Sequence, residues 1–113
     1  MRGMTGTMQN NTLDLKVKLI HGFSNKTRIQ ILECLKDEEK TVSQIVKEID
    51  GNQSNISQHL ACLKGCGIIA GRNEGKYCFY RLRNQHIRDL LDMFDLVLSD
   101  VHNDVACCEN HME

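Results

Sequence analysis

Apolar side chains recur every three or four residues through most of this chain, which is the period of amphipathic helices. From Leu13 onward the pattern predicts a first helix, and Ser24 is the predicted cap of a second one. The acidic stretch 36–40 predicts a turn after this pair. Over residues 87–101 the same spacing predicts a long helix with an apolar seam. The seam serves either core packing or contact between two copies of the chain.

Two shorter helices follow one another in the middle of the chain. Thr41 and Gln44 have the spacing of a capping box, and the apolar residues after them predict a helix that ends at Gly51. Residues 52–54 supply a turn and the next cap, and a second apolar stripe runs to the glycines of the stretch 65–67. Two short helices joined by a tight turn predict a helix-turn-helix.

Residues that favour β-strands follow this pair of helices. The runs 68–70 and 76–82 are separated by the polar stretch 71–75, which predicts a β-hairpin. A hairpin in this position is a wing. The pattern therefore predicts a mainly α fold with a small β-hairpin, namely a winged helix-turn-helix. Because 113 residues form one small domain with limited burial of its own, we expect a homodimer.

The expected organisation has three parts. A flexible N-terminal lead covers residues 1–12, the winged helix-turn-helix domain with its terminal dimerisation helices covers 13–103, and a cysteine-containing C-terminal tail covers 104–113. Charge interrupts every apolar run before it reaches the length of a membrane span, and the N-terminus lacks the apolar core of a secretory signal. We therefore expect a cytoplasmic protein without a membrane partner.

Charge is unevenly distributed, although the formal net charge is only -1. Residues 52–83 carry five basic side chains against one acidic one, whereas residues 84–113 carry one basic side chain against seven acidic ones. Affinity for nucleic acid depends on the local field, so the first of these stretches can attract phosphate while the tail repels it. Double-stranded DNA is therefore the expected partner.

The second helix of the predicted motif carries short polar side chains on its leading turns, and such side chains can approach base edges and phosphates closely. Alone, this pattern is equally typical of a solvated helix face, but the capped helix before it and the basic hairpin after it favour DNA binding. The expected contacts are Gln53, Ser54, Asn55, Ser57, Gln58, His59 and Lys64, with Arg72 and Lys76 at the hairpin tip. For His59 a packing role is the alternative, and for Tyr77 packing within a strand is as reasonable as a DNA contact.

The chain contains six cysteines, which in a cytosolic protein favours metal binding or thiol chemistry over disulfides. Cys62 and Cys66 lie one helical turn apart, close enough for both sulfurs to hold one metal ion. A pair with this spacing is by itself more often part of a core. Cys107 and Cys108 in the tail are the candidates for a further ligand. We assign no ligand role to Cys34 and Cys78, and hold His102 and His111 as weaker candidates.

The stretch Ser54-Asn-Ile-Ser-Gln-His-Leu60, with the capped helix before it and the glycine-containing hairpin after it, resembles the ArsR/SmtB family of metal-responsive repressors. The resemblance covers about residues 13–108. Residues 59–67 are most similar to the cadmium- and lead-sensing members, whose ligands are two cysteines of the recognition helix and one of the tail.

This resemblance implies that Cys62 and Cys66 bind the metal together with Cys107, or with Cys108 as the alternative tail ligand. The tail thiol would come from the other protomer. It further implies a homodimer that represses in its metal-free form and releases operator DNA when Cd(II) or Pb(II) binds, with As(III) and Zn(II) as further candidate effectors.

Two other functions remain compatible with the residues. The adjacent tail thiols could form a redox switch that regulates transcription, and the cysteines could buffer metal without any link to DNA. An enzyme is not expected, because no nucleophile, base and orienting group recur at the spacing of a catalytic motif.

Overall fold

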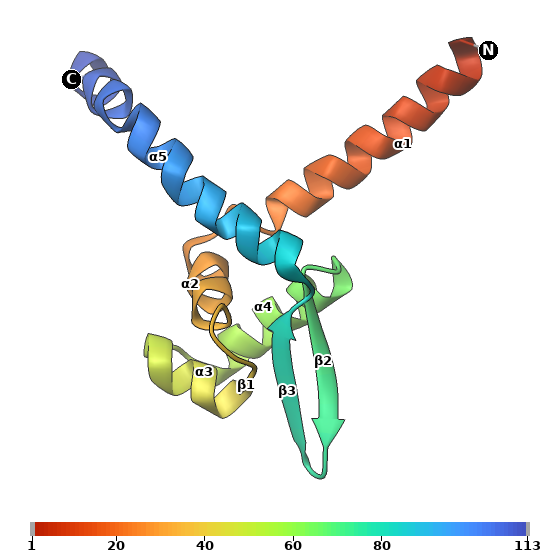
Figure 1. Cartoon of the computed structure of the whole chain (residues 1–113), viewed down its shortest axis with the longest axis vertical. Helices are drawn as coiled ribbons and strands as arrows, with labels where there is room; N and C mark the ends of the chain where they lie inside the picture. Colours follow the sequence, from red (N-terminus) through yellow and green to blue (C-terminus); the bar gives the residue numbers. More distant parts are fainter. Residues whose placement is uncertain (1, 113) are drawn as a thin grey trace. The chain divides into compact units, whose positions relative to one another are not determined.

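A computed structural model describes the backbone of residues 2–112 and the side chains of residues 11–102. It divides into two units, residues 1–83 and residues 84–113. The first unit contains, in chain order, α1 (Arg2–His21), α2 (Lys26–Cys34), β1 (Lys40–Thr41), α3 (Val42–Ile49), α4 (Gln53–Gly65), β2 (Ile69–Glu74) and β3 (Tyr77–Leu82). The second consists of α5 (Gln85–Met112), as labelled in Figure 1. The predicted winged helix-turn-helix is confirmed: α3 and α4 form the motif, and β2 and β3 form the wing.

The first helix of the motif has the local structure that the sequence predicts. At the start of α3 the Gln44 amide donates to Thr41 Oγ1 over 3.2 Å, and the Thr41 amide donates to Gln44 Oε1 over 2.8 Å. The helix ends at Asp50, which takes the left-handed conformation with φ 54°. A Cβ at position 51 would lie 2.8 Å from Ile56 Cδ1, so a larger residue there would displace this buried side chain. The turn therefore brings α3 and α4 into close contact.

The start of α2 differs from the prediction by one residue. Asn25, rather than Ser24, is its N-cap, and the Asn25 side chain accepts a hydrogen bond from the Arg28 amide over 3.1 Å. Ser24 acts on the preceding helix instead, since its hydroxyl donates to the His21 carbonyl at the end of α1 over 2.9 Å. Both residue types are good partners for unpaired groups at helix ends, so the sequence alone did not distinguish them.

The sheet is larger than the predicted hairpin. Lys40 and Thr41, at the end of the predicted acidic turn, form a short strand that pairs with β3 and gives the order β1-β3-β2. The predicted loop 71–75 is also wrong, because β2 continues to Glu74 and the turn is confined to Gly75 and Lys76. Polar side chains suggested a loop, but a ladder can continue through exposed polar residues because its hydrogen bonds come from the backbone.

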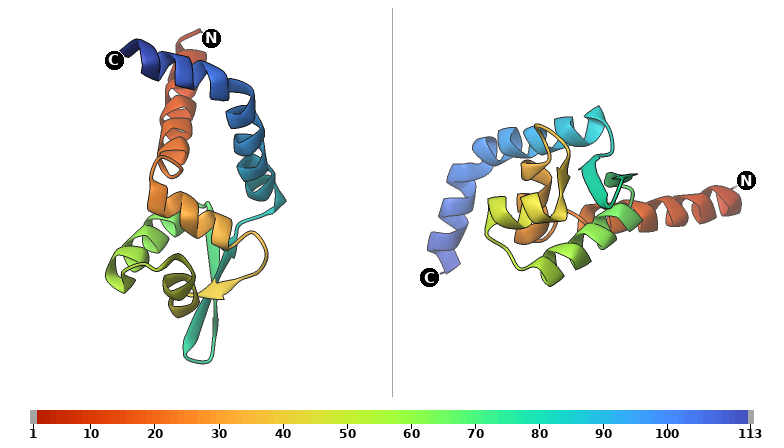
Figure 2. Two further views of the ribbon diagram at one scale, coloured as in Figure 1. Left: turned by 90° about the vertical axis from the view of Figure 1, so that its left-hand side faces the viewer. Right: turned by 90° about the horizontal axis from the view of Figure 1, so that it is seen from below.

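The core of the first unit is formed by apolar side chains from α2, α3, α4 and the strands. Figure 2 shows these three helices gathered at the base of the hairpin. The buried side chains of this core include Ile31, Leu32, Leu35, Ile45, Ile56, Leu60, Leu63, Ile68, Ile69 and Leu82. Complete burial of one such side chain contributes roughly 1.5–3 kcal/mol, so the three buried side chains of α4 bind that helix to the core.

The two terminal helices carry apolar side chains that remain exposed. On α1 these are Leu13, Leu15, Val17, Leu19 and Ile20, and on α5 they are Met93, Phe94, Leu96, Val97, Leu98 and Val101. In the described part of the chain, no helix combines the length and the apolar character needed to cross a membrane. α1 includes residues of the predicted flexible lead, and the side chains of residues 2–10 lie outside the described ones. The predicted division at residue 12 stays a prediction.

Candidate functional site

The second helix of the motif is defined at both ends by local hydrogen bonds. At its start the Asn55 amide donates to Asn52 Oδ1 over 3.1 Å, which satisfies one of the unpaired amides of α4. At its end the Cys66 amide donates to the Cys62 carbonyl over 3.0 Å. Gly67 then takes φ 80°, a left-handed conformation that reverses the chain toward β2.

Loss of the Asn52 cap should destabilise the domain without changing its core. We expect Asn52→Ala to lower the free energy of unfolding by about 1 kcal/mol, because one amide of α4 loses its partner. Asn73→Ala is the matched control, since it removes the same side chain from an exposed position of β2. Urea denaturation followed by circular dichroism measures both variants. Equal stability of the two would show that the cap contributes nothing.

The leading turns of α4 separate cleanly into a buried and an exposed face. Ile56, Leu60 and Leu63 are fully buried against the core. The polar side chains between them point to solvent, and these are Gln53, Ser54, Asn55, Ser57 and Gln58. Lys64 is exposed on the last turn. The structure therefore presents these predicted DNA contacts, apart from His59, on one helix and outside the core.

His59 differs from its neighbours because its ring is partly buried. Its Nδ1 accepts a hydrogen bond from Arg28 Nε of α2 over 3.1 Å. Burial, and to a lesser degree the positive charge of Arg28, lowers the pKa of His59. The neutral ring that results keeps the lone pair that this bond requires. This bond fits the packing role that the sequence left as an alternative, and the DNA contact of His59 stays a prediction.

Cys62 and Cys66 carry free thiols, and both are partly exposed on the flank of α4 that also bears His59. Their spacing of four residues places the two side chains one above the other. Cys107 and Cys108 belong to α5, but their side chains lie outside the described residues. Among the side chains of residues 11–102, no three His, Cys, Asp or Glu side chains gather where they could hold a metal ion. The structure thus places two of the predicted ligands four residues apart at the end of α4 and does not test the third.

Cys34 has the core position that the sequence predicts. It is 6% exposed on α2, and the neighbouring Glu48 of α3 accepts a hydrogen bond from its thiol. Burial and this bond raise the pKa of Cys34 to about 12. A protonated thiol is a poor metal ligand, because the thiolate is the form that coordinates. Cys34 is therefore structural.

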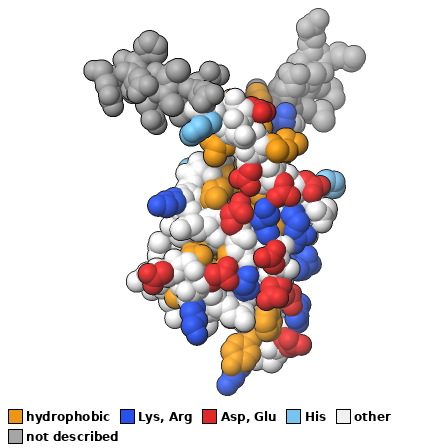
Figure 3. Space-filling model, turned by 60° about the vertical axis from the view of Figure 1, so that its left-hand side comes forward, with side chains coloured by type: hydrophobic (Ala, Val, Ile, Leu, Met, Phe, Trp, Pro, Cys, Tyr) orange, Lys and Arg blue, Asp and Glu red, His pale blue; other side chains and the backbone are white. Residues whose placement is uncertain are grey.

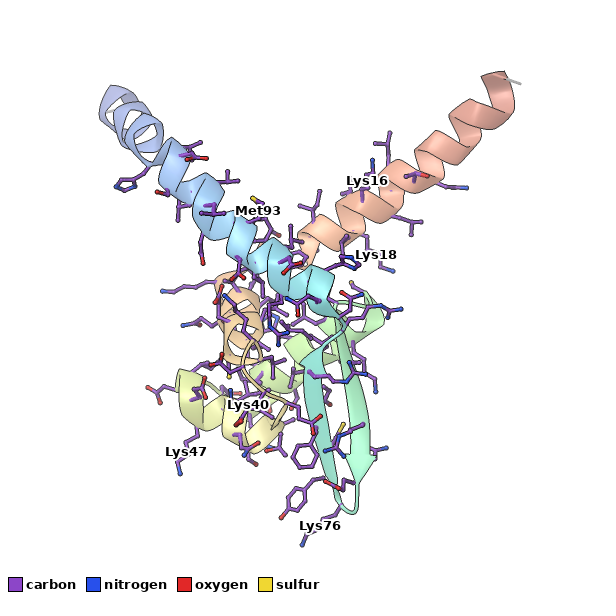
Figure 4. All side chains as sticks on the ribbon, in the orientation of Figure 1. Lys16, Lys18, Lys40, Lys47, Lys76 and Met93 are labelled. Carbon is purple, nitrogen blue, oxygen red and sulfur yellow. The ribbon has the colours of Figure 1, made fainter. Side chains whose placement is uncertain are left out.

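The wing places its two predicted DNA contacts differently. Figure 4 shows Lys76 at the tip of the hairpin, and its ammonium lies 5.8 Å from the centre of the Tyr77 ring. Tyr77 is 56% exposed, so it does not pack within the sheet. In Figure 3 hydrophobic and basic side chains meet at this end of the molecule. A cation beside an exposed aromatic ring can contact both a phosphate and the wall of a groove.

Arg72 lies inside β2, opposite Phe79, and not at the predicted hairpin tip. Its Nε lies 2.9 Å and 3.0 Å from the two carboxylate oxygens of Glu39, and its guanidinium stacks 4.9 Å from the centre of the Phe79 ring. Glu74 adds a weaker ion pair at 3.5 Å. These bonds lower the pKa of Glu39 and raise that of Arg72. The Arg72 charge is therefore largely matched within the protein.

Two residues of this region were missed by sequence reasoning, namely Arg28 and Glu39. Their partners lie 31 and 33 residues away along the chain. A hydrogen bond between such distant positions has no local pattern, and the helical period of α2 accounts equally well for an exposed arginine.

Comparison with known proteins shows that this chain is similar to bacterial transcriptional regulators. A family model described as bacterial regulatory protein, arsR family, matches residues 25–70. The HTH-type transcriptional regulator KmtR of Mycobacterium tuberculosis is 33% identical over 88 residues, which cover 78% of this chain and 66% of KmtR. The HTH-type transcriptional regulator CmtR of Mycobacterium bovis is 31% identical over 90 residues, covering 80% of this chain and 76% of CmtR.

A solved structure with a similar fold points to the same family as these relatives. It is the homodimeric winged helix-turn-helix DNA-binding domain of a possible ArsR-family transcriptional regulator from Mycobacterium bovis. It superimposes with a TM-score of 0.77 at 27% identity, covering 85% of this chain and 88% of that one.

Proposed function

The chain belongs to the ArsR family of winged helix-turn-helix DNA-binding transcriptional regulators, and we propose that it is a metal-sensing repressor. As the metal-free homodimer it binds double-stranded operator DNA in the cytoplasm. It releases this DNA when a thiophilic cation binds its cysteine thiolates. Cd(II) and Pb(II) are the proposed effectors, with As(III) or Zn(II) as chemically acceptable substitutes.

The observation that carries this proposal is the position of Cys62 and Cys66. Both thiols are free and partly exposed and stand four residues apart, Cys62 on the helix that would read DNA and Cys66 at its C-cap. Two adjacent thiolates form a soft donor pair that suits large thiophilic cations and does not suit calcium or magnesium. The third donor is a tail thiol, Cys107 or Cys108, supplied by the partner protomer.

DNA contact and metal binding would then use different parts of one helix. The exposed polar side chains among residues 53–58 lie on its leading turns, and the thiols lie on its last turn and its C-cap. Lys64 and, on the wing, Lys76 add positive charge for phosphates. A bond between the last turns and an acidic tail would alter both the placement and the local field of α4. A coupling of about 1–3 kcal/mol, typical of allostery, lowers DNA affinity roughly 5- to 150-fold.

A cadmium titration of the metal-free wild-type protein tests this proposal. We expect an intense ultraviolet band from sulfur bound to Cd(II), together with a fall in fluorescence anisotropy of a labelled duplex that the protein has selected from a random pool. A band without DNA release would leave metal buffering as the function. DNA release by diamide in metal-free buffer, with no cadmium band, would instead support the redox switch.

A smaller prediction concerns the wing. Glu39→Gln should raise DNA affinity about two- to fivefold, because it releases the Arg72 guanidinium and removes a negative charge near the duplex. If Arg72 then contacts one more phosphate, the slope of log affinity against log salt concentration should steepen by roughly 0.9. Glu38→Gln is the matched control, since it makes the same charge change at the adjacent exposed position. Anisotropy titrations at several salt concentrations compare the two variants. Identical behaviour would mean that Arg72 does not reach DNA.

A further inference from the structure

Arg28 lies where the end of α1 and the start of α2 meet the middle of α4. Its side chain projects from the first turn of α2, and its Nη1 donates to the carbonyl of His21, the last residue of α1, over 3.1 Å. Its Nε donates to Nδ1 of His59 in the middle of α4 over 3.1 Å. The backbone amide of Arg28 is itself held by Asn25 at the start of α2. One side chain thus connects α1 and α2 to the reading helix.

In this contact Arg28 is the only donor, and the groups on both sides of it accept. A guanidinium is planar, always charged and only a donor, so its position requires acceptors on both sides. The His21 carbonyl is one of the last carbonyls of α1, which have no partner within the helix, and it accepts from the amide and hydroxyl of Ser24 as well as from Arg28. The neutral His59 ring supplies the other acceptor, consistent with the lowered pKa of His59. With Nδ1 accepting, the ring proton is on Nε2.

Packing restricts the same junction in a second way. A Cβ at Gly22 would lie 2.5 Å from Ile68 Cδ1 and 3.8 Å from Leu63 Cδ2. Gly22 follows α1 directly, Leu63 is buried on α4, and Ile68 is buried just beyond it. The end of α1 therefore lies against the C-terminal part of the reading helix, and Arg28 holds the middle of that helix.

We propose that Arg28 is a positioning residue for DNA recognition, which sets the orientation of α4 by holding His59 against the end of α1. Because Ser57 and Gln58 precede His59 directly, a rotation of α4 about its axis would displace these exposed side chains from the groove. Arg28 itself need not touch DNA. The inference rests on the proposed role of α4 in reading DNA and is independent of the metal site.

Single substitutions test the two halves of the contact. Arg28→Gln and His59→Leu should each lower affinity for the selected duplex about tenfold, the effect of a charge-assisted hydrogen bond of ordinary strength. His59→Asn should remain within about threefold of wild type, because its amide oxygen takes the place of Nδ1. Lys26→Gln, which removes a charge from the first residue of α2, is the matched control. Circular dichroism at the assay temperature confirms that each variant is folded.

The double variant and the salt dependence distinguish positioning from other roles. If the two residues act as one unit, the double variant Arg28→Gln, His59→Leu should bind DNA about tenfold more weakly than wild type. If they act independently, the two losses of affinity multiply to about a hundredfold. The slope of log affinity against log salt concentration should be unchanged in Arg28→Gln, because Arg28 makes no phosphate contact in this proposal. Removal of one phosphate contact would reduce that slope by roughly 0.9. A hundredfold loss, or a reduced slope, would overturn the proposal.

The cadmium titration keeps this inference separate from the proposed metal response. Arg28→Gln should retain the cadmium band and the same fold-decrease in DNA affinity on metal binding, starting from its weaker metal-free affinity. Failure of wild-type protein to respond to cadmium, with the Arg28–His59 coupling intact, would refute only the metal-sensing function. Loss of the coupling with an intact cadmium response would refute only the role of Arg28.

Discussion

Replacement of Cys62 by serine is expected to abolish the cadmium response and to leave metal-free DNA binding within about twofold of wild type. Cys62 is partly exposed on the last turns of α4, away from the polar leading turns, and Sγ→Oγ is a small change, so we expect little loss of packing or DNA contact. A hydroxyl is a much poorer ligand than a thiolate for soft cations. The roughly 5- to 150-fold decrease in affinity caused by metal should therefore disappear.

Cys78→Ser is the matched control for this variant. Cys78 is also a free and partly exposed thiol, but it lies on β3 and has no proposed ligand role. Its replacement should leave both the ultraviolet band and the DNA response unchanged. Cys107→Ser and Cys108→Ser, titrated in the same way, identify the tail ligand. A cadmium response that survives in Cys62→Ser would place the sensing site elsewhere.

Mixed dimers determine which protomer supplies the tail thiol. A dimer of one Cys62→Ser chain and one chain that lacks the tail ligand retains one complete site if the tail crosses to the partner. It retains none if the tail binds within its own chain. Cadmium stoichiometry of the purified mixed dimer distinguishes these arrangements.

The second large effect concerns the dimer. Leu98 is 58% exposed on α5, in the same apolar seam as Val97 and Val101. We expect Leu98→Glu to separate the protomers, because a buried charge without a partner is strongly unfavourable in an apolar interface. A monomer binds one half-site alone, and loss of the second linked contact lowers DNA affinity by about 10²- to 10⁴-fold.

Ser99→Glu provides the control, since it introduces the same charge at the adjacent exposed position of α5. Sedimentation velocity gives the association state, and anisotropy with the selected duplex gives the affinity. Ser99→Glu should remain a dimer with at most a small loss of affinity from charge repulsion. A Leu98→Glu protein that still sediments as a dimer would show that this part of α5 is not the interface.

Several features of the protein could be predicted because their signals are local in the sequence. The capping box at Thr41 and Gln44, the buried stripe of α4 and the cap at Asn52 each depend on residues within one or two helical turns. These signals predicted the helix-turn-helix, and with the hairpin they indicated the family. The exposed polar face of α4 and the spacing of Cys62 and Cys66 follow from the helical period as well.

The sequence by itself therefore determined the fold class, the position of the second helix of the motif and the choice of candidate thiols. Tertiary structure alone decided which polar groups are already engaged. Glu39 pairs with the Arg72 guanidinium, Arg28 donates a hydrogen bond to His59, and β1 adds a strand to the sheet. The reason is physical: helical periods and caps arise within a few residues, whereas these bonds join positions more than thirty residues apart and exist only after the helices have packed.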